Sequence, residues 1–288
     1  MGKKKQGKNK GRPAGPTMAE QADRHELYQR AVQSPAADVE FFTRAFADAR
    51  GGKAPLRLRE DFCGTALLAT AWCASDPRRT AIGVDLDGPT LTWGLTRNVA
   101  AAGPEVASRV SLVEGDVRSV TSPAPVDVVC AMNFSYCVFK DRAALRDYFE
   151  AVRRGLNDDG VFVAELYGGT EAIDLLEEDR IIDDDLTYVW EQERFNPLDH
   201  STTCHIHFVF SDDSRIDRAF TYEWRLWTLP EMRELLLEAG FREVKIYWEE
   251  VEEDEDDEEM LRGTGEYSEV TTMDENQESW LVYVVAIA

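Results

Sequence analysis

The sequence has little of three things: long hydrophobic runs, cysteine and positive charge. No segment of the 288 residues approaches the roughly 20 apolar residues that span a bilayer, so we expect no membrane segment. The start is basic from Lys3 to Arg12, but no apolar run follows, so it does not have the pattern of a secretory signal. Five cysteines without CxxC spacing favour a reducing compartment over a disulfide framework, and we expect a cytoplasmic protein.

The shortage of positive charge also limits the partners. The chain has 55 acidic and 32 basic residues, a formal net charge of -23, which disfavours a nucleic-acid substrate. Residues 1–20 are basic and lack a core-forming pattern, so we expect a disordered tail. Carboxylates fill Glu249 to Glu259, and we expect an acidic loop over 249–278 that could attract a basic protein partner.

What the sequence does have is a regular alternation of strand and helix patterns. Short apolar segments alternate with segments of helical periodicity, which favours a doubly wound α/β sheet covered on both faces. With 43% hydrophobic residues, the chain can bury the core of one large domain, which we expect over 56–288. Strands are predicted over 56–60, 80–85, 110–114, 126–132 and 160–167, and helices over 66–75, 88–101 and 142–156.

The pattern changes after Tyr167. Aromatic and β-branched residues between turn signals predict an antiparallel β meander over 183–226, inserted after the fifth strand. Residues 21–55 predict an N-terminal helical segment, interrupted near Pro35. Strands are predicted over 186–193, 202–210, 215–225, 244–248 and 280–286, and a further helix over 229–239.

Carboxylates and a glycine stand where successive strands end. Glu60 to Thr65 turns from the first strand into the first helix, and Gly64 permits a ligand to approach the main chain closely. Asp85 ends the second strand, where a carboxylate can bind ribose hydroxyls, although Asp85 or Asp87 would also suit a plain helix cap. Asp116 follows the third strand and could receive an exocyclic amino group. Because parallel strands end at one edge, we expect one ligand site.

This series of motifs resembles the class I S-adenosylmethionine-dependent methyltransferases over roughly residues 55–288. The segments that carry the resemblance are Glu60 with Cys63-Gly64-Thr65, Gly83-Val84-Asp85, Glu114-Gly115-Asp116, Val126-Asp127-Val128-Val129, Leu156 to Phe162 and Leu237 to Phe241. The resemblance implies a seven-stranded sheet whose last strand is antiparallel, with S-adenosyl-L-methionine as the cofactor. It implies that the cofactor-binding residues are Glu60, Phe62, Cys63, Gly64, Thr65, Asp85, Leu86, Asp116, Val117 and Asn133.

The first turn departs from the family's usual Gly-x-Gly-x-Gly. Phe62 and Ala66 occupy the outer glycine positions, so we expect the methionine end of the cofactor to lie differently there. A nicotinamide-binding sheet is the main rival, but it would require both missing glycines. It would also give no reason for a carboxylate at Asp116.

The acceptor side offers two kinds of candidate residue. Asn133 and Tyr136 follow the fourth strand, beside the transferable methyl group in the family's fold, so we take them as candidate catalytic residues, with plain packing as the alternative. His205 and His207 share one face of a predicted strand. Two imidazoles do not make a metal site, and we predict none. We expect a packed or solvated pair, or a general base if the meander covers the cleft.

The resemblance implies methyl transfer to a nitrogen or oxygen of a small-molecule acceptor. The meander would then cover the substrate, and the helices of residues 21–55 would supply a lid, with Tyr28 as a cofactor contact. One alternative is methylation of a basic protein drawn by the acidic loop. Another is a cofactor-binding scaffold that has lost catalysis through its altered turn.

Overall fold

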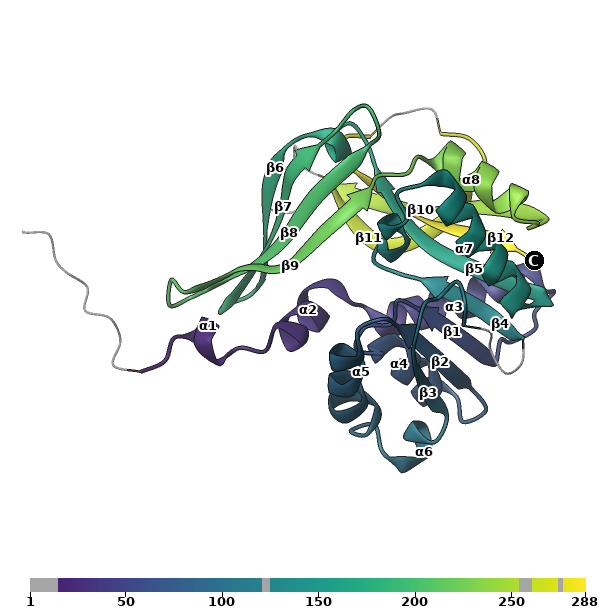
Figure 1. Cartoon of the computed structure of the whole chain (residues 1–288), viewed down its shortest axis with the longest axis horizontal. Helices are drawn as coiled ribbons and strands as arrows, with labels where there is room; N and C mark the ends of the chain where they lie inside the picture. Colours follow the sequence, from purple (N-terminus) through teal and green to yellow (C-terminus); the bar gives the residue numbers. More distant parts are fainter. Residues whose placement is uncertain (1–14, 121–124, 254–260, 274–276) are drawn as a thin grey trace, which may run out of the picture.

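The protein is built on one large sheet with a second, smaller sheet beside it (Figure 1). This computed structural model describes residues 15–120, 125–253, 261–273 and 277–288. The large sheet has eight strands in the order β11-β10-β12-β5-β4-β1-β2-β3. Its strands are β1 (Arg57–Asp61), β2 (Thr80–Asp85), β3 (Val110–Glu114), β4 (Val126–Ala131), β5 (Leu156–Gly168), β10 (Glu243–Glu253), β11 (Leu261–Val270) and β12 (Trp280–Ile287).

The direction of the strands confirms the predicted doubly wound α/β class. Strands β1 to β5 are parallel neighbours, with β1 between β2 and β4. The last strand, β12, pairs antiparallel with β5, so that Tyr283 stands opposite Glu165. Strand β10 pairs antiparallel with β12. The antiparallel last strand is therefore confirmed, whereas the sheet has eight strands rather than the predicted seven.

The extra strand lies where we predicted an acidic loop over 249–278. Strand β10 continues to Glu253 and β11 pairs with it antiparallel, so much of this segment is a β hairpin. Residues 254–260 and 274–276 of the predicted loop lie outside the described residues. The strand was missed because the acidic pattern predicts a loop and few side chains of the strand are buried. One contact that holds it is the ring of Tyr267, which packs against aromatic rings of α3 (Pro35–Ala49) and β12.

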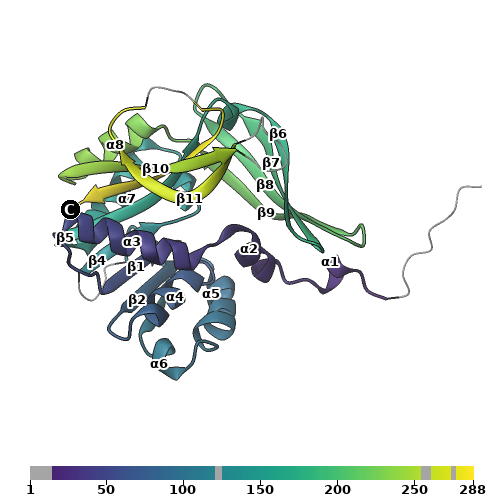
Figure 2. The same ribbon diagram turned by 180° about the vertical axis from the view of Figure 1, so that it is seen from behind.

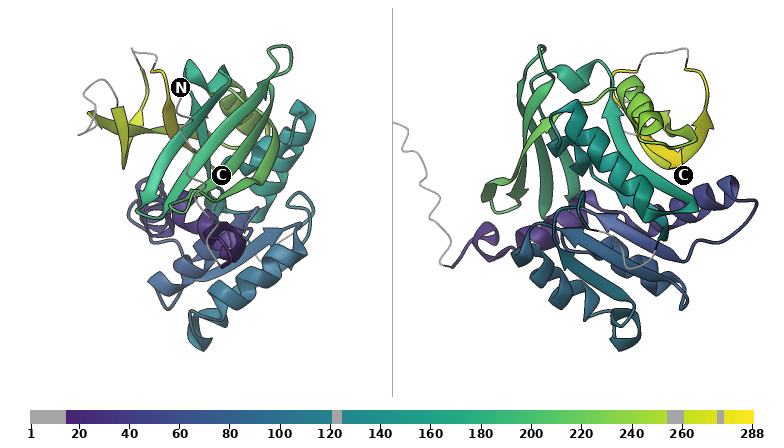
Figure 3. Two further views of the ribbon diagram at one scale, coloured as in Figure 1. Left: turned by 90° about the vertical axis from the view of Figure 1, so that its left-hand side faces the viewer. Right: turned by 45° about the vertical axis from the view of Figure 1, so that its right-hand side comes forward.

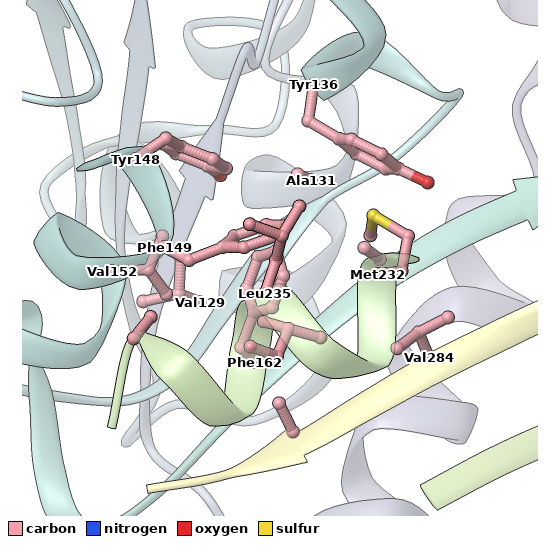
Figure 4. Close-up of a cluster of buried hydrophobic side chains, with 14 of the residues drawn as sticks. Val129, Ala131, Tyr136, Tyr148, Phe149, Val152, Phe162, Met232, Leu235 and Val284 are labelled. Carbon is pink, nitrogen blue, oxygen red and sulfur yellow. The ribbon is translucent and has the colours of Figure 1, made fainter. Parts of the chain in front are cut away.

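Helices cover both faces of the large sheet (Figure 2). On one face α3 and α4 bury Phe42 and Trp72 against Leu58 of β1. On the other, α7 and α8 pack Phe149 and Leu235 onto Phe162 of β5 (Figure 4). No helix in the described ranges is long and apolar enough to cross a membrane. The helices after β1 are α4 (Leu67–Ser75), α5 (Gly88–Gly94) with the π-helical η1 (Leu95–Val99), α6 (Pro104–Ala107), η2 (Ser135–Val138), α7 (Arg142–Gly155), η3 (Glu171–Ile173) and α8 (Leu229–Glu238).

The second sheet is an antiparallel meander that stands apart from the large one as a separate layer (Figure 3). Its strands are β6 (Leu176–Asp183), β7 (Leu186–Phe195), β8 (Ser201–Phe210) and β9 (Arg215–Arg225). The predicted boundary of 183–226 begins too late, because β6 is exposed and acidic and shows no alternating apolar pattern. One face of the meander is apolar, and its Ile206 and Phe208 pack towards Leu27 of helix α2 (Arg24–Val32).

Three helices precede β1, and they have different surroundings. They are α1 (Met18–Gln21), α2 (Arg24–Val32) and α3 (Pro35–Ala49). The segment 21–55 is not a lid throughout, because α3 buries Phe42 and Phe46 in the core, and only α1 and α2 lie against the meander. The prediction of a disordered tail over residues 1–20 is wrong at its C-terminal end, because Thr17 caps helix α1 in a capping box. Residues 1–14 lie outside the described residues.

Candidate active site

A cavity of about 310 Å³ opens where β1, β2 and β4 end, between α2 and the meander strand β9. Figure 1 shows α2 running between the large sheet and the meander. The carboxyl ends of parallel strands are the usual ligand-binding edge of such a sheet. The cavity thus joins the predicted turn and Asp85 in one site. Its lining is Arg24, His25, Tyr28 and Gln33, then Glu60 to Thr65, Asp85, Asp87, Thr90, Met132, Asn133, Ser135, Phe220 and Tyr222.

A larger groove, of about 530 Å³, runs along α8 and β10. It contains none of the predicted site residues. Its walls include Glu243 and Val244, at the start of β10. Since β10 runs parallel to β5, this is the edge of the sheet opposite the strand ends. Position therefore favours the smaller cavity as the candidate active site.

The turn after β1 keeps a left-handed main chain without its outer glycines. Phe62, Gly64 and Ala66 have φ angles of 58°, 51° and 54°. Such angles cost little for glycine and about 1 kcal/mol or more for other residues. The ring of Phe62 packs against Phe139 and Tyr148, with centroids 5.9 and 5.6 Å away. The packing of the Phe62 ring therefore stabilises a left-handed turn that glycine would adopt at little cost.

Asp85 is fixed to this turn by hydrogen bonds. The main-chain N–H of Gly64 donates to one carboxylate oxygen at 2.7 Å, and that of Asp87 donates to the other at 2.9 Å. Asp87 caps α5 by accepting from Thr90 N–H and its hydroxyl. The helix cap is thus Asp87. Asp85 is left at the cavity wall with lone pairs that remain free for a ligand.

Glu60 lies deeper in the wall, only 4% exposed. One carboxylate oxygen accepts from the Ala69 N–H at 2.8 Å, at the start of α4. Burial above all, together with the nearby carboxylates of Asp38, Asp85 and Asp61, raises the pKa of Glu60 to about 8 against the lowering effect of that hydrogen bond. Glu60 therefore holds its proton near neutrality unless a positive charge enters the cavity.

Three predicted cofactor-binding residues, Leu86, Asp116 and Val117, lie outside the cavity lining, beside it at the ends of β2 and β3. The Arg118 guanidinium hydrogen-bonds to Asp116 and holds the pKa of that carboxyl below its usual range. Val117 is buried, whereas Leu86 is 71% exposed. An exposed leucine next to Asp85 offers an apolar face for a flat ring. The structure brings these three residues to the predicted edge of the sheet.

The segment after β4 corrects one candidate catalytic residue. Asn133 lines the cavity with a φ of 52°, and its N–H donates to the Glu165 carboxylate. Tyr136 instead lies in the core, fully buried, and its hydroxyl donates to the Glu165 carbonyl at 2.7 Å (Figure 4). Because that hydroxyl is used and enclosed, the prediction of a catalytic Tyr136 is wrong, and plain packing accounts for it.

The two meander histidines face away from the cavity. His205 contacts Glu193 and Thr221, and His207 contacts Glu191, on the polar face of β8. The apolar face of the same strand is the one that packs towards α2. A general-base role is therefore excluded by direction. No group of three or more potential metal ligands occurs among the described residues.

Most of the cavity wall formed by α2 and β9 was not predicted from the sequence. Tyr28 was expected from the resemblance and lines the cavity, but His25, Gln33 and Phe220 were not. Helix α2 is tied to the turn by Gln29, whose amide donates to the Thr65 hydroxyl at 2.7 Å. These residues come from distant segments, and only the periodicity of α2 pointed to a packed helix there.

The order of the sheet and the position of the cavity define the class I S-adenosylmethionine-dependent methyltransferase fold. Solved structures match nearly the whole chain. The match to DesVI from Streptomyces venezuelae covers 92% of this chain and 98% of the DesVI chain, with a TM-score of 0.65 and 16% identity. A methyltransferase from Clostridium acetobutylicum covers 90% and 96%, with a TM-score of 0.63 and 16% identity.

A third similar structure is CalS10, an amino pentose methyltransferase from Micromonospora echinaspora with bound S-adenosylmethionine. It covers 91% of this chain and 95% of its own, with a TM-score of 0.63 and 17% identity. No protein-family model matches the chain, and no curated protein matches it by sequence. The class I methyltransferase fold is thus established by structure, at sequence identities that show the fold alone.

Proposed function

We propose that this protein transfers a methyl group from S-adenosyl-L-methionine to a nitrogen or oxygen of a small molecule. The observation that carries the proposal is the cavity, in which the Glu60-to-Thr65 turn, Asp85 and Asn133 meet beneath an aromatic wall. A strand-to-helix turn with free amides and a carboxylate on the next strand suit a nucleoside with a charged tail.

The described residues fit the cofactor. Asp85 is placed to bind the ribose hydroxyls, and Leu86 offers an apolar face to the purine, with Asp116 and Val117 beside it. The turn at Gly64 presents main-chain groups to the methionine end. Bound there, the cofactor would supply an electrophilic methyl carbon on a sulfonium. The chain's own task is then to orient the acceptor and exclude water, since displacement at that carbon needs little else.

The remaining wall suits a small acceptor. Tyr28, Phe220 and Tyr222 close the cavity from α2 and β9. Four acidic side chains line it against one guanidinium, that of Arg24. Asp61 is paired with the buried Arg59, and the remaining carboxyl groups favour a cationic or amine-bearing acceptor over an anionic one. The amino pentose acceptor of CalS10 is consistent with that choice. We therefore expect nitrogen to be the methylated atom.

Binding calorimetry tests the cofactor. Wild type is expected to bind S-adenosylmethionine in the micromolar range, and Asp85→Ala at least about tenfold more weakly, because two ribose hydrogen bonds are lost. Asp199→Ala, in an exposed turn of the meander, is the matched control and should bind as wild type does. Equal binding by Asp85→Ala and wild type would contradict the proposed site.

A methyl-label transfer screen then tests turnover. We expect label to reach small amines, and not basic peptides, because the cavity is closed by the meander and α2. Label on basic peptides alone would favour the protein-substrate alternative. Tight cofactor binding with no transfer to any acceptor would favour a scaffold without catalysis.

A further inference from the structure

The end of α2 brings an amide without a hydrogen-bond partner to the cavity wall. Gln33 lines the cavity, and its Oε1 atom is buried with no partner among the described residues. A buried carbonyl oxygen that lacks a donor is unfavourable, so such groups are rare without a ligand or water to satisfy them. Gln33 therefore marks a place where the ligand must bring N–H or O–H groups.

Glu60 gives this place a second acceptor. It lines the same cavity, and only one of its oxygens accepts a hydrogen bond, from the Ala69 N–H. Of the three carboxyl groups that raise the pKa of Glu60, Asp61 is paired with the buried guanidinium of Arg59, whereas no lysine or arginine among the described residues forms an ion pair with Glu60 itself, Asp38 or Asp85. This part of the wall thus lacks donors for its free acceptors and a cation to pair with the carboxyl groups of Glu60 and Asp85. A primary ammonium group, with three donors and one positive charge, satisfies both needs.

The position of Gln33 indicates whose ammonium this is. Gln29, four residues earlier, donates to the Thr65 hydroxyl on the turn after β1. Gln33 is the C-cap of α2, its N–H donates to the Gln29 carbonyl, and it lines the cavity together with the Glu60-to-Thr65 turn. That turn is where the methionine end of the methyl donor is expected. An acceptor amine would lie further out, beneath the aromatic wall.

We propose that Gln33 Oε1 and the Glu60 carboxylate together bind the α-ammonium group of S-adenosylmethionine, so that the end of α2 completes the cofactor site. The inference rests on the proposed function. It assigns a cofactor contact to a residue outside the family's sequence motifs. It also relates α2 to the altered turn. The family's outer glycines would have let the ligand approach the main chain more closely, and here the end of α2 supplies an acceptor instead.

Calorimetry with two ligands tests the proposal. S-adenosylhomocysteine carries the ammonium, whereas 5′-methylthioadenosine has the nucleoside and lacks the amino-acid part. Gln33→Leu should weaken S-adenosylhomocysteine binding at least about tenfold and change 5′-methylthioadenosine binding less than about twofold, because only the first ligand uses the lost acceptor. Gln33→Glu keeps an acceptor and should retain the preference for S-adenosylhomocysteine.

Gln21→Leu, the same change on the exposed helix α1, is the matched control and should bind both ligands as wild type does. Thermal unfolding of each variant confirms that it is folded. The proposal is overturned if Gln33→Leu binds S-adenosylhomocysteine normally, or if it weakens both ligands equally, since Gln33 would then only hold α2 in place. Failure of wild type to bind S-adenosylhomocysteine would instead remove the proposed function itself.

Discussion

At the scale of single residues, side chains stand where the fold ordinarily uses glycine. Phe62 and Ala66 keep the left-handed angles of the missing glycines. Phe62 offsets the cost by packing its ring between Phe139 and Tyr148. The ring thus packs towards the core, while Phe62, Cys63 and Gly64 all line the cavity.

Restoring glycine at position 62 should therefore weaken the protein. Phe62→Gly relieves about 1 kcal/mol of backbone strain but loses the packing of a large ring, for which about 3 kcal/mol is a modest estimate. We expect the free energy of unfolding to fall by about 2 kcal/mol in urea denaturation. Ala66→Gly gains the same relief and loses only a methyl group, so it should stay within about 0.5 kcal/mol of wild type. A stabilised Phe62→Gly would mean that strain, not packing, dominates this turn.

At the scale of elements, α2 is the link between the two sheets. Asp23 caps it by accepting from the His25 N–H, and also accepts from the Trp93 indole N–H of α5 at 2.8 Å. The Gln29–Thr65 hydrogen bond fixes the middle of the helix to the turn. Its other side packs against the apolar face of the meander. A nine-residue helix is marginal by itself, so these contacts hold it over the cavity.

Loss of the Asp23 carboxylate should loosen α2 locally. Asp23→Ala removes the cap and the indole hydrogen bond, for which we expect a loss of about 1 to 2 kcal/mol in the local opening free energy of α2. Hydrogen exchange of the α2 amides measures this directly. Asp141→Ala is the matched control, because Asp141 stands at the N-cap of α7 without a side-chain cap hydrogen bond. If the hydrogen exchange of the α2 amides were unchanged in Asp23→Ala, the meander and the Gln29–Thr65 hydrogen bond would be enough to hold the helix.

At the scale of the whole molecule, buried carboxyl groups are concentrated at and behind the site. Glu60, Glu165 and Asp38 have pKa values raised by burial to about 8, about 8 and about 6. The folded chain therefore keeps protons that the unfolded chain releases. A raised carboxyl pKa gives stability that is fully present below the unfolded pKa and lost as the pH rises through the folded pKa.

The cofactor-free protein should thus lose stability between about pH 5 and pH 8. Glu60→Gln removes one contributor, and we expect its advantage over wild type to grow with pH by up to about 1.4 kcal/mol per unit in this window. Asp61 and Asp85 on β1 and β2 and Asp38 on α3 face Glu60 and share the repulsion. Urea denaturation at pH 5, 6.5 and 8 measures the trend. Parallel curves for both proteins would contradict a protonated Glu60.

Much of the fold was predictable because its signals are local. Apolar runs and helical periodicity over β1 to β5 predicted the parallel sheet, and Asp85 and Gly64 were found from their places at strand ends. Strand β6 was missed because its sequence is acidic and mostly exposed, and β11 because its side chains are mostly exposed and two glycines interrupt the strand pattern. The catalytic prediction for Tyr136 failed for a related reason, since an aromatic residue after a strand reads the same in a core and in a cleft.

The sequence by itself determined the α/β class, the order of strand and helix, and the carboxylates that meet at one edge of the sheet. Those depend on periodicity and turn chemistry within a few residues. Only the tertiary structure decided which walls close the cavity: Gln33 and Tyr28 from α2, Phe220 from β9, with Tyr136 turned into the core. Packing between segments far apart in the chain fixes those directions, and no local pattern records which distant surface a side chain will meet.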